Sequence, residues 1–132
     1  MTVIQNSVDI HKPIEAVYAF LSDMNNHKRL MPDNIDNWSS TTDEARFAIK
    51  NMATFALKIS QRVVNKEIVC TPIEKPPFVL TLKWKLEDKG VNQTGATFVI
   101  EAELNMMMKM MASGPLQKLA DHQVTMLQSI LG

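Results

Sequence analysis

Apolar and polar residues alternate through most of the chain. Seven segments show this period of two, which is typical of β-strands with one buried and one exposed face. The connections between them are short enough for hairpins, apart from the break at Lys75-Pro76-Pro77. The pattern therefore predicts an antiparallel sheet whose strands are Val3–Ile10, Ile35–Ser39, Arg46–Asn51, Thr54–Val64, Glu67–Ile73, Phe78–Glu87 and Thr97–Met107.

Helical spacing appears first after the opening strand. Pro13 suits the first position of a helix, and Ile14, Val17 and Leu21 then recur on one face. Ser22-Asp23 ends this helix and is expected to cap a second short helix over Asn25–Met31.

A long amphipathic helix is predicted over Pro115–Leu131, opened by Ser113-Gly114-Pro115. This helix is the only element long enough to cover the apolar face of the sheet, and burying those surfaces is the main stabilising term. We therefore predict one α+β domain over residues 1–132, in which a curved sheet wraps the helix and leaves a hollow between them.

Composition narrows the function classes. Fourteen basic residues balance fourteen acidic ones, which gives no electrostatic reason to expect nucleic acid as a partner. Cys70 is the only cysteine, so no disulfide forms within the chain. The first residues do not read as a signal peptide, and no stretch is apolar enough for a membrane span. We expect a soluble cytoplasmic protein without integral membrane association and without a cofactor.

The N-terminal block SVDIHKPIEAVYAFLSDMNNHKRLMPDNIDNW resembles the START-like superfamily, also called SRPBCC or polyketide cyclase/dehydrase-like. The matching positions form an I-x-x-P-x-E-x-V run followed by F-L-x-D: Ile10, Pro13, Glu15, Val17, Phe20, Leu21 and Asp23. The resemblance implies the helix-grip fold, with two short helices after the first strand and a long C-terminal helix. It also implies a deep apolar cavity for a lipid, sterol, quinone or polyketide-like ligand.

The inward positions of the predicted strands and of the last helix are candidate cavity-lining residues. Any one of the aromatic residues is more readily explained as core, but together they favour flat or acyl ligands. The predicted lining is Phe47, Phe55, Leu57, Leu82, Trp84, Phe98, Ile100, Leu104, Met106, Leu119, Gln123 and Leu127.

Two features carry open alternatives. Gln123 falls inside the apolar stripe of the last helix, where it either bonds a neighbouring strand or orients a ligand head or a water. Five of the ten methionines lie within Met106–Met111. Met106 and Met110 are expected in the core, while others in the run form a soft rim at the cavity mouth or an interface, which leaves a homodimer open.

The ionisable residues suggest neither a catalytic nor a metal site. His11, His27 and His122 share no metal-ligand spacing, and Cys70 has no identifiable base and is expected to be a buried inert thiol. Glu101 and Glu103 alternate onto the exposed strand face. Arg46 and Arg62 do the same.

The leading hypothesis is non-catalytic binding of a hydrophobic small molecule between the sheet and the last helix. One alternative is a cyclase-like or dehydratase-like enzyme, which would need at least two inward ionisable groups. The other is a co-chaperone-like interaction module. The fold by itself does not choose among them.

Overall fold

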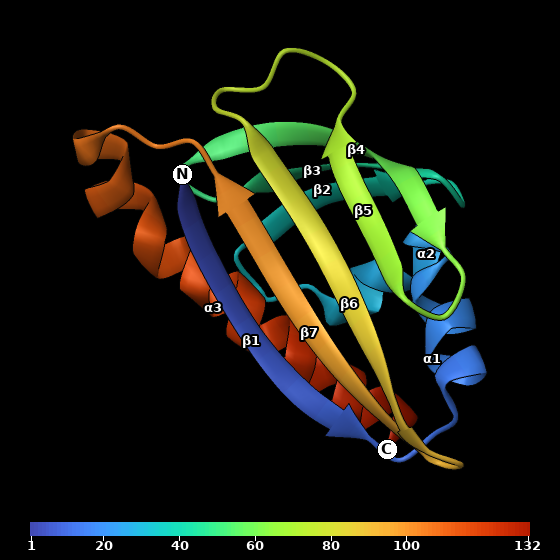
Figure 1. Ribbon diagram of the computed structural model, residues 1–132. Coiled ribbons are helices and arrows are strands. Elements are labelled where there is room, and N and C mark those ends of the chain that lie inside the picture. Colours follow the sequence, from blue (N-terminus) through green and yellow to red (C-terminus); the bar gives the residue numbers. More distant parts are fainter.

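Seven antiparallel strands form one curled sheet, described by a computed structural model of residues 1–132 (Figure 1). The order across the sheet is β1-β7-β6-β5-β4-β3-β2, so the first strand returns to pair with the last. The strands are β1 (Thr2–Ile10), β2 (Ile35–Ser40), β3 (Glu44–Ile49), β4 (Ala53–Val63), β5 (Glu67–Pro72), β6 (Leu80–Gly90) and β7 (Gln93–Ala102).

The helices occupy two stretches of the chain. Between β1 and β2 lie α1 (Ile14–Leu21), α2 (Met24–His27) and the 3-10 turn η1 (Lys28–Leu30). The long α3 (Met106–Leu131) closes the chain and packs chiefly against β1 and β7 (Figure 1). None of the helices combines the length and the apolar character that a bilayer crossing requires. The predicted α+β helix-grip architecture is confirmed.

The ends of the first helices follow from local chemistry. Pro13 is the N-cap of α1 rather than its first residue, with extended backbone angles. Asp23 caps α2 as predicted, because its Oδ1 accepts a hydrogen bond from the backbone N of Asn25 at 2.9 Å. This compact turn carries the chain from the end of α1 into η1.

The concave face of the sheet and the inner side of α3 form one hydrophobic core of 28 buried residues. Register explains how the strands contribute to it, since residues directly opposite each other share a face. Ile68 pairs with Trp84, Trp84 pairs with Phe98, and Leu82 pairs with Ile100, and all of these side chains are buried. The alternation seen in the sequence is therefore the alternation of the core.

The start of α3 was predicted wrongly. The helix begins at Met106, and Pro115 lies inside it. The predicted strand over Thr97–Met107 is β7, which ends at Ala102. The cause is Asn105, whose Oδ1 accepts a hydrogen bond from Met108 N at 2.9 Å and so caps a helix built from methionines, which are good helix formers.

The β6–β7 turn also lies later than the sequence indicated. The predicted strand Phe78–Glu87 is β6, which continues through Asp88-Lys89-Gly90 before the chain turns. The register shifts between Asp88 and Gly90, and Asp88 Oδ1 accepts a hydrogen bond from Gly90 N at 3.0 Å. This bulge bends the strand before the chain reverses at Val91-Asn92.

Candidate ligand-binding site

The structure brings ten of the twelve predicted lining residues together in the buried interior. Leu104 is half-buried, and Met106 is 82% exposed at the first position of α3, outside that interior. The prediction that Met106 lies in the core is wrong, because β7 ends at Ala102, before the chain reaches Met106. The buried members are Phe47, Phe55, Leu57, Leu82, Trp84, Phe98, Ile100, Leu119, Gln123 and Leu127.

Buried apolar side chains from both the sheet and α3 meet in the space between them. No pocket of the structure is lined by any of the twelve predicted residues. Four aromatic side chains, those of Trp84, Phe47, Phe55 and Phe98, are among the largest that are fully buried. The interior hollow therefore stays a prediction, and the concave apolar surface that the structure does contain lies at its edge.

That surface is a pocket of about 340 Å³ beside the first turns of α3, which we name the mouth pocket. It lies where the β3–β4 turn, the loop before β6 and α3 approach one another. Most of its lining is apolar, and two of its side chains are methionines from the run in the sequence. The lining residues are Lys50, Asn51, Met52, Pro77, Phe78, Met108, Met111, Ala112 and Pro115.

Local backbone chemistry builds each wall of the mouth pocket. The β3–β4 turn reverses through Asn51, whose φ of 62° is tolerated by asparagine better than by most residues. Pro76 and Pro77 cannot donate to a sheet ladder, so the chain bulges out as a loop before β6. On α3, Met108, Ala112 and Pro115 recur at helical spacing and face the same way.

An aromatic row leads from the mouth pocket into the core. Phe78 lines the pocket and packs edge-on against Phe55, with ring centroids 5.3 Å apart. Phe55 contacts Phe47 at 6.0 Å, and Phe47 stacks on Trp38 at 5.6 Å. Two residues of the predicted lining, Phe47 and Phe55, are thus connected to the pocket through Phe78.

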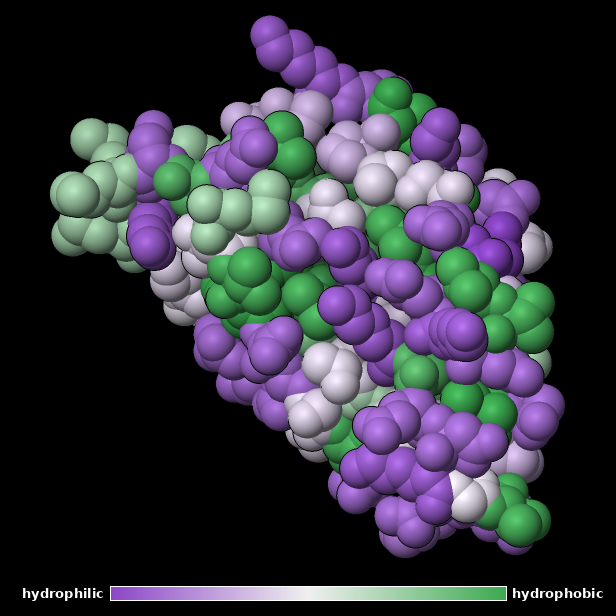
Figure 2. Space-filling view, in the orientation of Figure 1, coloured by the Kyte–Doolittle hydropathy of each residue, from purple (hydrophilic) through white to green (hydrophobic).

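The methionine run divides between pocket and solvent. Met108 is half-buried and lines the mouth pocket together with Met111. Met106 and Met110 are both 82% exposed, so the expectation that they lie in the core is wrong. They belong to the first turns of α3, which project beyond the sheet in Figure 1, and moderately hydrophobic side chains gather at that end of the molecule in Figure 2.

Gln123 is fully buried on the inner side of α3. Its Nε2 donates to the sulfur of Met31 at 3.3 Å, and its Oε1 has no hydrogen-bond partner in the protein. The alternative in which Gln123 bonds a neighbouring strand is therefore not what the structure shows. Its only contact of this kind is with a thioether, which is a weak acceptor.

Two ionisable groups are buried in or beside the core. Burial raises the pKa of the Cys70 thiol to about 12, although the positive charge of Arg62 opposes this shift. The thiol is therefore protonated at neutral pH, as expected for an inert cysteine. Burial lowers the pKa of His27, and its Nε2 lies 2.8 Å from the Leu21 carbonyl oxygen. Both groups hold structural positions.

Arg62 faces the concave side, contrary to the sequence prediction. The register of β4 shifts between Ile59 and Gln61, so Arg62 lies opposite the buried Ile68. Its guanidinium donates to the Ser22 carbonyl oxygen at 2.8 Å and to Asp43 Oδ1 at 2.7 Å. Arg62 thus ties the end of α1 to the β2–β3 turn, and a bulge that alternation does not reveal explains the error.

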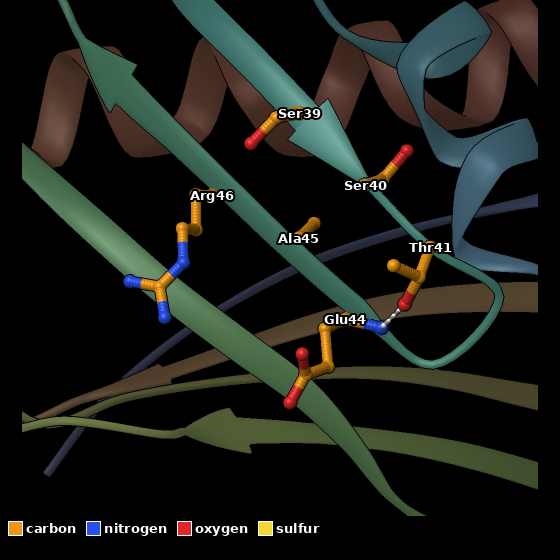
Figure 3. Close-up of a pocket in the computed structure, with 6 residues that line it drawn as sticks. All are labelled: Ser39, Ser40, Thr41, Glu44, Ala45 and Arg46. Carbon is orange, nitrogen blue, oxygen red and sulfur yellow. Dashed lines mark hydrogen bonds between the residues drawn. The ribbon is translucent and has the colours of Figure 1, made fainter.

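Arg46 and Glu101 lie on the outer face, as predicted, whereas Glu103 follows the end of β7. Arg46 is exposed and pairs with Glu74 at 2.8 Å, and Glu101 pairs with Lys83 at 2.8 Å. Arg46 also lines a polar pocket at the β2–β3 hairpin, shown in Figure 3, where the Glu44 backbone N donates to Thr41 Oγ1 at 3.2 Å. Ala45 is its one hydrophobic lining residue, which makes it a poor site for an apolar ligand.

Comparisons with known proteins identify the fold. No protein-family model matches the chain, and no curated protein matches it either. Among solved structures, it is similar to the Zhui aromatase/cyclase from Streptomyces sp. R1128, with a TM-score of 0.75 and 9% identity over 98% of this chain and 93% of that one.

Two further structures agree along nearly their whole length. A START superfamily protein from Mycobacterium smegmatis matches with a TM-score of 0.69 and 14% identity, over 97% of this chain and 98% of that one. The protein XoxI from Bacillus cereus matches with a TM-score of 0.77 and 12% identity, over 99% and 96%. The chain therefore has the START-like helix-grip fold that its N-terminal block implied.

Proposed function

We propose that the protein binds a hydrophobic small molecule, such as a lipid, quinone, sterol or polyketide-like compound, without catalysing a reaction on it. The mouth pocket carries this proposal. Its volume of about 340 Å³ lies within the range of small-molecule pockets, and most of its lining is apolar. We place the binding in the cytoplasm, in keeping with a single free cysteine.

The mouth pocket adjoins the predicted lining through Phe78, whose ring packs on that of Phe55. Met108 and Met111 have flexible side chains that adapt to irregular shapes, and Phe78 leads to the aromatic row. A molecule larger than the pocket enters the interior by displacing these side chains. The predicted lining residues around Leu119 and Trp84 then form its deeper walls.

The similar aromatase/cyclase structure favours a second candidate, an enzyme that acts on a polyketide or aromatic substrate in the same pocket. Lys50 is the one ionisable residue of the mouth pocket and would be its proton donor or acceptor. Such an enzyme needs at least two ionisable groups facing its substrate, so the pocket favours the binding role. The two candidates differ in one observable: the binding protein returns its ligand unchanged, whereas the enzyme releases a product.

Paired methionine variants test the proposal. Met108→Ala/Met111→Ala removes two pocket walls, and Met106→Ala/Met110→Ala removes two exposed side chains that do not line it. With the neutral fluorescent probe N-phenyl-1-naphthylamine, we expect the first variant to weaken binding about tenfold and the second to bind like the wild type. Equal effects of the two variants would contradict the proposal.

Native mass spectrometry of protein purified from its host complements the titration. A co-purifying apolar molecule, identified after solvent extraction, names the natural ligand. The same spectrum reports the oligomer mass and so tests the homodimer that the methionine run leaves open. A ligand that is chemically altered on incubation with fresh protein would instead support the enzyme.

A further inference from the structure

Two polar atoms in the core have no partner in the protein. They are Nε1 of Trp84, whose residue is 1% exposed, and Oε1 of Gln123, whose residue is fully buried. Buried polar groups in native proteins are nearly always paired, because an unpaired one keeps the full penalty of leaving water. Two such atoms in one interior leave a donor and an acceptor free to bond a further molecule.

The two atoms are chemically complementary. The indole N–H of Trp84 only donates, and the amide oxygen of Gln123 only accepts. Trp84 lies on the concave face of β6, packed against Phe98 with ring centroids 5.0 Å apart. Gln123 lies on the side of α3 that faces the same core, among the buried residues Leu119, Ala120 and Leu127.

Gln123 lies further along the helix that lines the mouth pocket. Ala112 lines the pocket, and Leu116, Leu119 and Gln123 follow it along the buried side of α3. Gln123 is eleven residues beyond Ala112, or about 16 Å along the helix axis. The weak bond from its Nε2 to the Met31 sulfur, at 3.3 Å, is easily given up to an oxygen acceptor.

Resting on the proposed function, we propose that the ligand is a neutral apolar molecule that carries a hydroxyl group, which Trp84 and Gln123 recognise. A hydroxyl accepts a hydrogen bond from an N–H and donates one to a carbonyl oxygen, so an alcohol or phenol satisfies both atoms. A hydrocarbon leaves both unpaired. A ketone accepts from Trp84 but has nothing to donate to Gln123.

The charges around the core disfavour an acid in this position. A buried carboxylate needs a cation, and the interior offers none that is free. His27 is held neutral by burial, which lowers its pKa, and the Arg62 guanidinium is already bonded to Ser22 and Asp43. Repulsion from Gln123 Oε1 adds to the penalty. The site thus prefers an alcohol to a fatty acid of the same size.

Two probes of equal size isolate the hydroxyl: 2-naphthol and 2-methylnaphthalene. Calorimetric titration of the wild type is expected to give about tenfold tighter binding for 2-naphthol. Trp84→Phe and Gln123→Leu should each reduce that preference. The matched controls are Trp38→Phe, whose Nε1 already donates to Ser40 Oγ at 2.9 Å, and Gln117→Leu on the exposed side of α3. Both controls should keep the preference.

A spectroscopic readout needs no core variant. The chain has two tryptophans, so a ¹H–¹⁵N spectrum holds two indole signals, which Trp38→Phe assigns. We expect 2-naphthol to move the Trp84 signal downfield and 2-methylnaphthalene to leave it without that shift. This measurement observes Trp84 in a protein that keeps it, so it remains valid even if the Trp84→Phe variant fails to fold.

Each remaining outcome decides between the two proposals. Equal binding of the two probes, or a preference kept by both core variants, overturns hydroxyl recognition and leaves apolar binding intact. Binding of neither probe counts against the proposed function, and the hydroxyl inference falls with it. A stronger response to 2-naphthoate than to 2-naphthol overturns the preference for a neutral ligand.

Discussion

The two halves of α3 meet the rest of the protein in opposite ways. Before Pro115, the helix carries four methionines that are 67–82% exposed, and it projects beyond the sheet (Figure 1). After Pro115, Leu116, Leu119 and Leu127 are fully buried against the sheet. The first half of α3, residues 106–114, is therefore largely exposed, and we call it the arm. The second half covers the core. The mouth pocket lies beside the arm and reaches Pro115, where the two halves join.

The difference shows which forces form each half. The second half is held by burial of its apolar side, the usual source of helix stability in proteins. The first half depends on the Asn105 cap and on the helix propensity of methionine. A ligand site at their junction has one rigid wall and one adaptable wall, which suits an apolar molecule of irregular shape.

The largest expected effect is a difference in the free energy of unfolding between truncations in the two halves of α3. Leu119→Ala leaves a cavity in the core and should lower the free energy of unfolding by about 3 kcal/mol, whereas Met110→Ala should change it by less than about 0.5 kcal/mol. Urea unfolding followed by circular dichroism measures both. Similar losses for the two variants would remove the distinction between arm and core.

A smaller effect is expected at the junction itself. Pro115 has no N–H to donate within α3, so Pro115→Ala restores a helix hydrogen bond and should stabilise the protein by about 1–2 kcal/mol. Thermal unfolding measures this change. A loss of stability would mean that Pro115 holds the arm in place through its contacts at the mouth pocket.

A substitution at Gln123 tests how well the buried half of α3 is bonded in the ligand-free protein. Removing an amide with an unpaired buried oxygen should stabilise the fold, so Gln123→Leu is expected to raise the free energy of unfolding by about 1 kcal/mol. Chemical denaturation of protein stripped of bound molecules checks it. A marked destabilisation would show that the amide is well bonded without a ligand.

The smallest expected effect is a loss of stability at acidic pH. His27 precedes η1, which packs against α3, and burial lowers its folded-state pKa below the ordinary value of 6.5. The unfolded chain therefore takes up a proton more readily, and stability falls as the pH drops from 6.5 toward the folded pKa, while it is complete above 6.5. Unfolding at several pH values should show His27→Gln losing this dependence and the exposed His11→Gln keeping it.

Alternation was enough to predict the sheet, because the period of two correctly places the buried residues Leu80, Leu82 and Trp84 of β6 and Ala96, Phe98 and Ile100 of β7. The alternation gave wrong predictions where a local feature shifts which residues face inward or ends the strand. The bulge near Ser60 turns Arg62 inward, and the Asn105 cap starts a helix where Met106 still seemed to continue a strand. Both depend on local backbone geometry that a pattern of residue types does not contain.

The candidate site could be predicted only in part. Phe47, Trp84 and Gln123 lie in the interior that the sequence indicated. Phe78 and Met52 of the mouth pocket were missed, since they come from segments next to turns, where periodicity carries no information. Two features of the sequence could have indicated this pocket, namely the turn at Asn51 and the loop at Pro76-Pro77. Loops at one edge of a curved sheet surround its opening, where binding sites are common.

Methionine methyl resonances give the most direct test that an apolar ligand binds at the mouth pocket. The protein is labelled with ¹³C-methyl methionine and titrated with N-phenyl-1-naphthylamine. We expect saturating shifts at Met52, Met108 and Met111, with Met106 and Met110 nearly unchanged. Shifts confined to Met106 and Met110, or none at all, would contradict it.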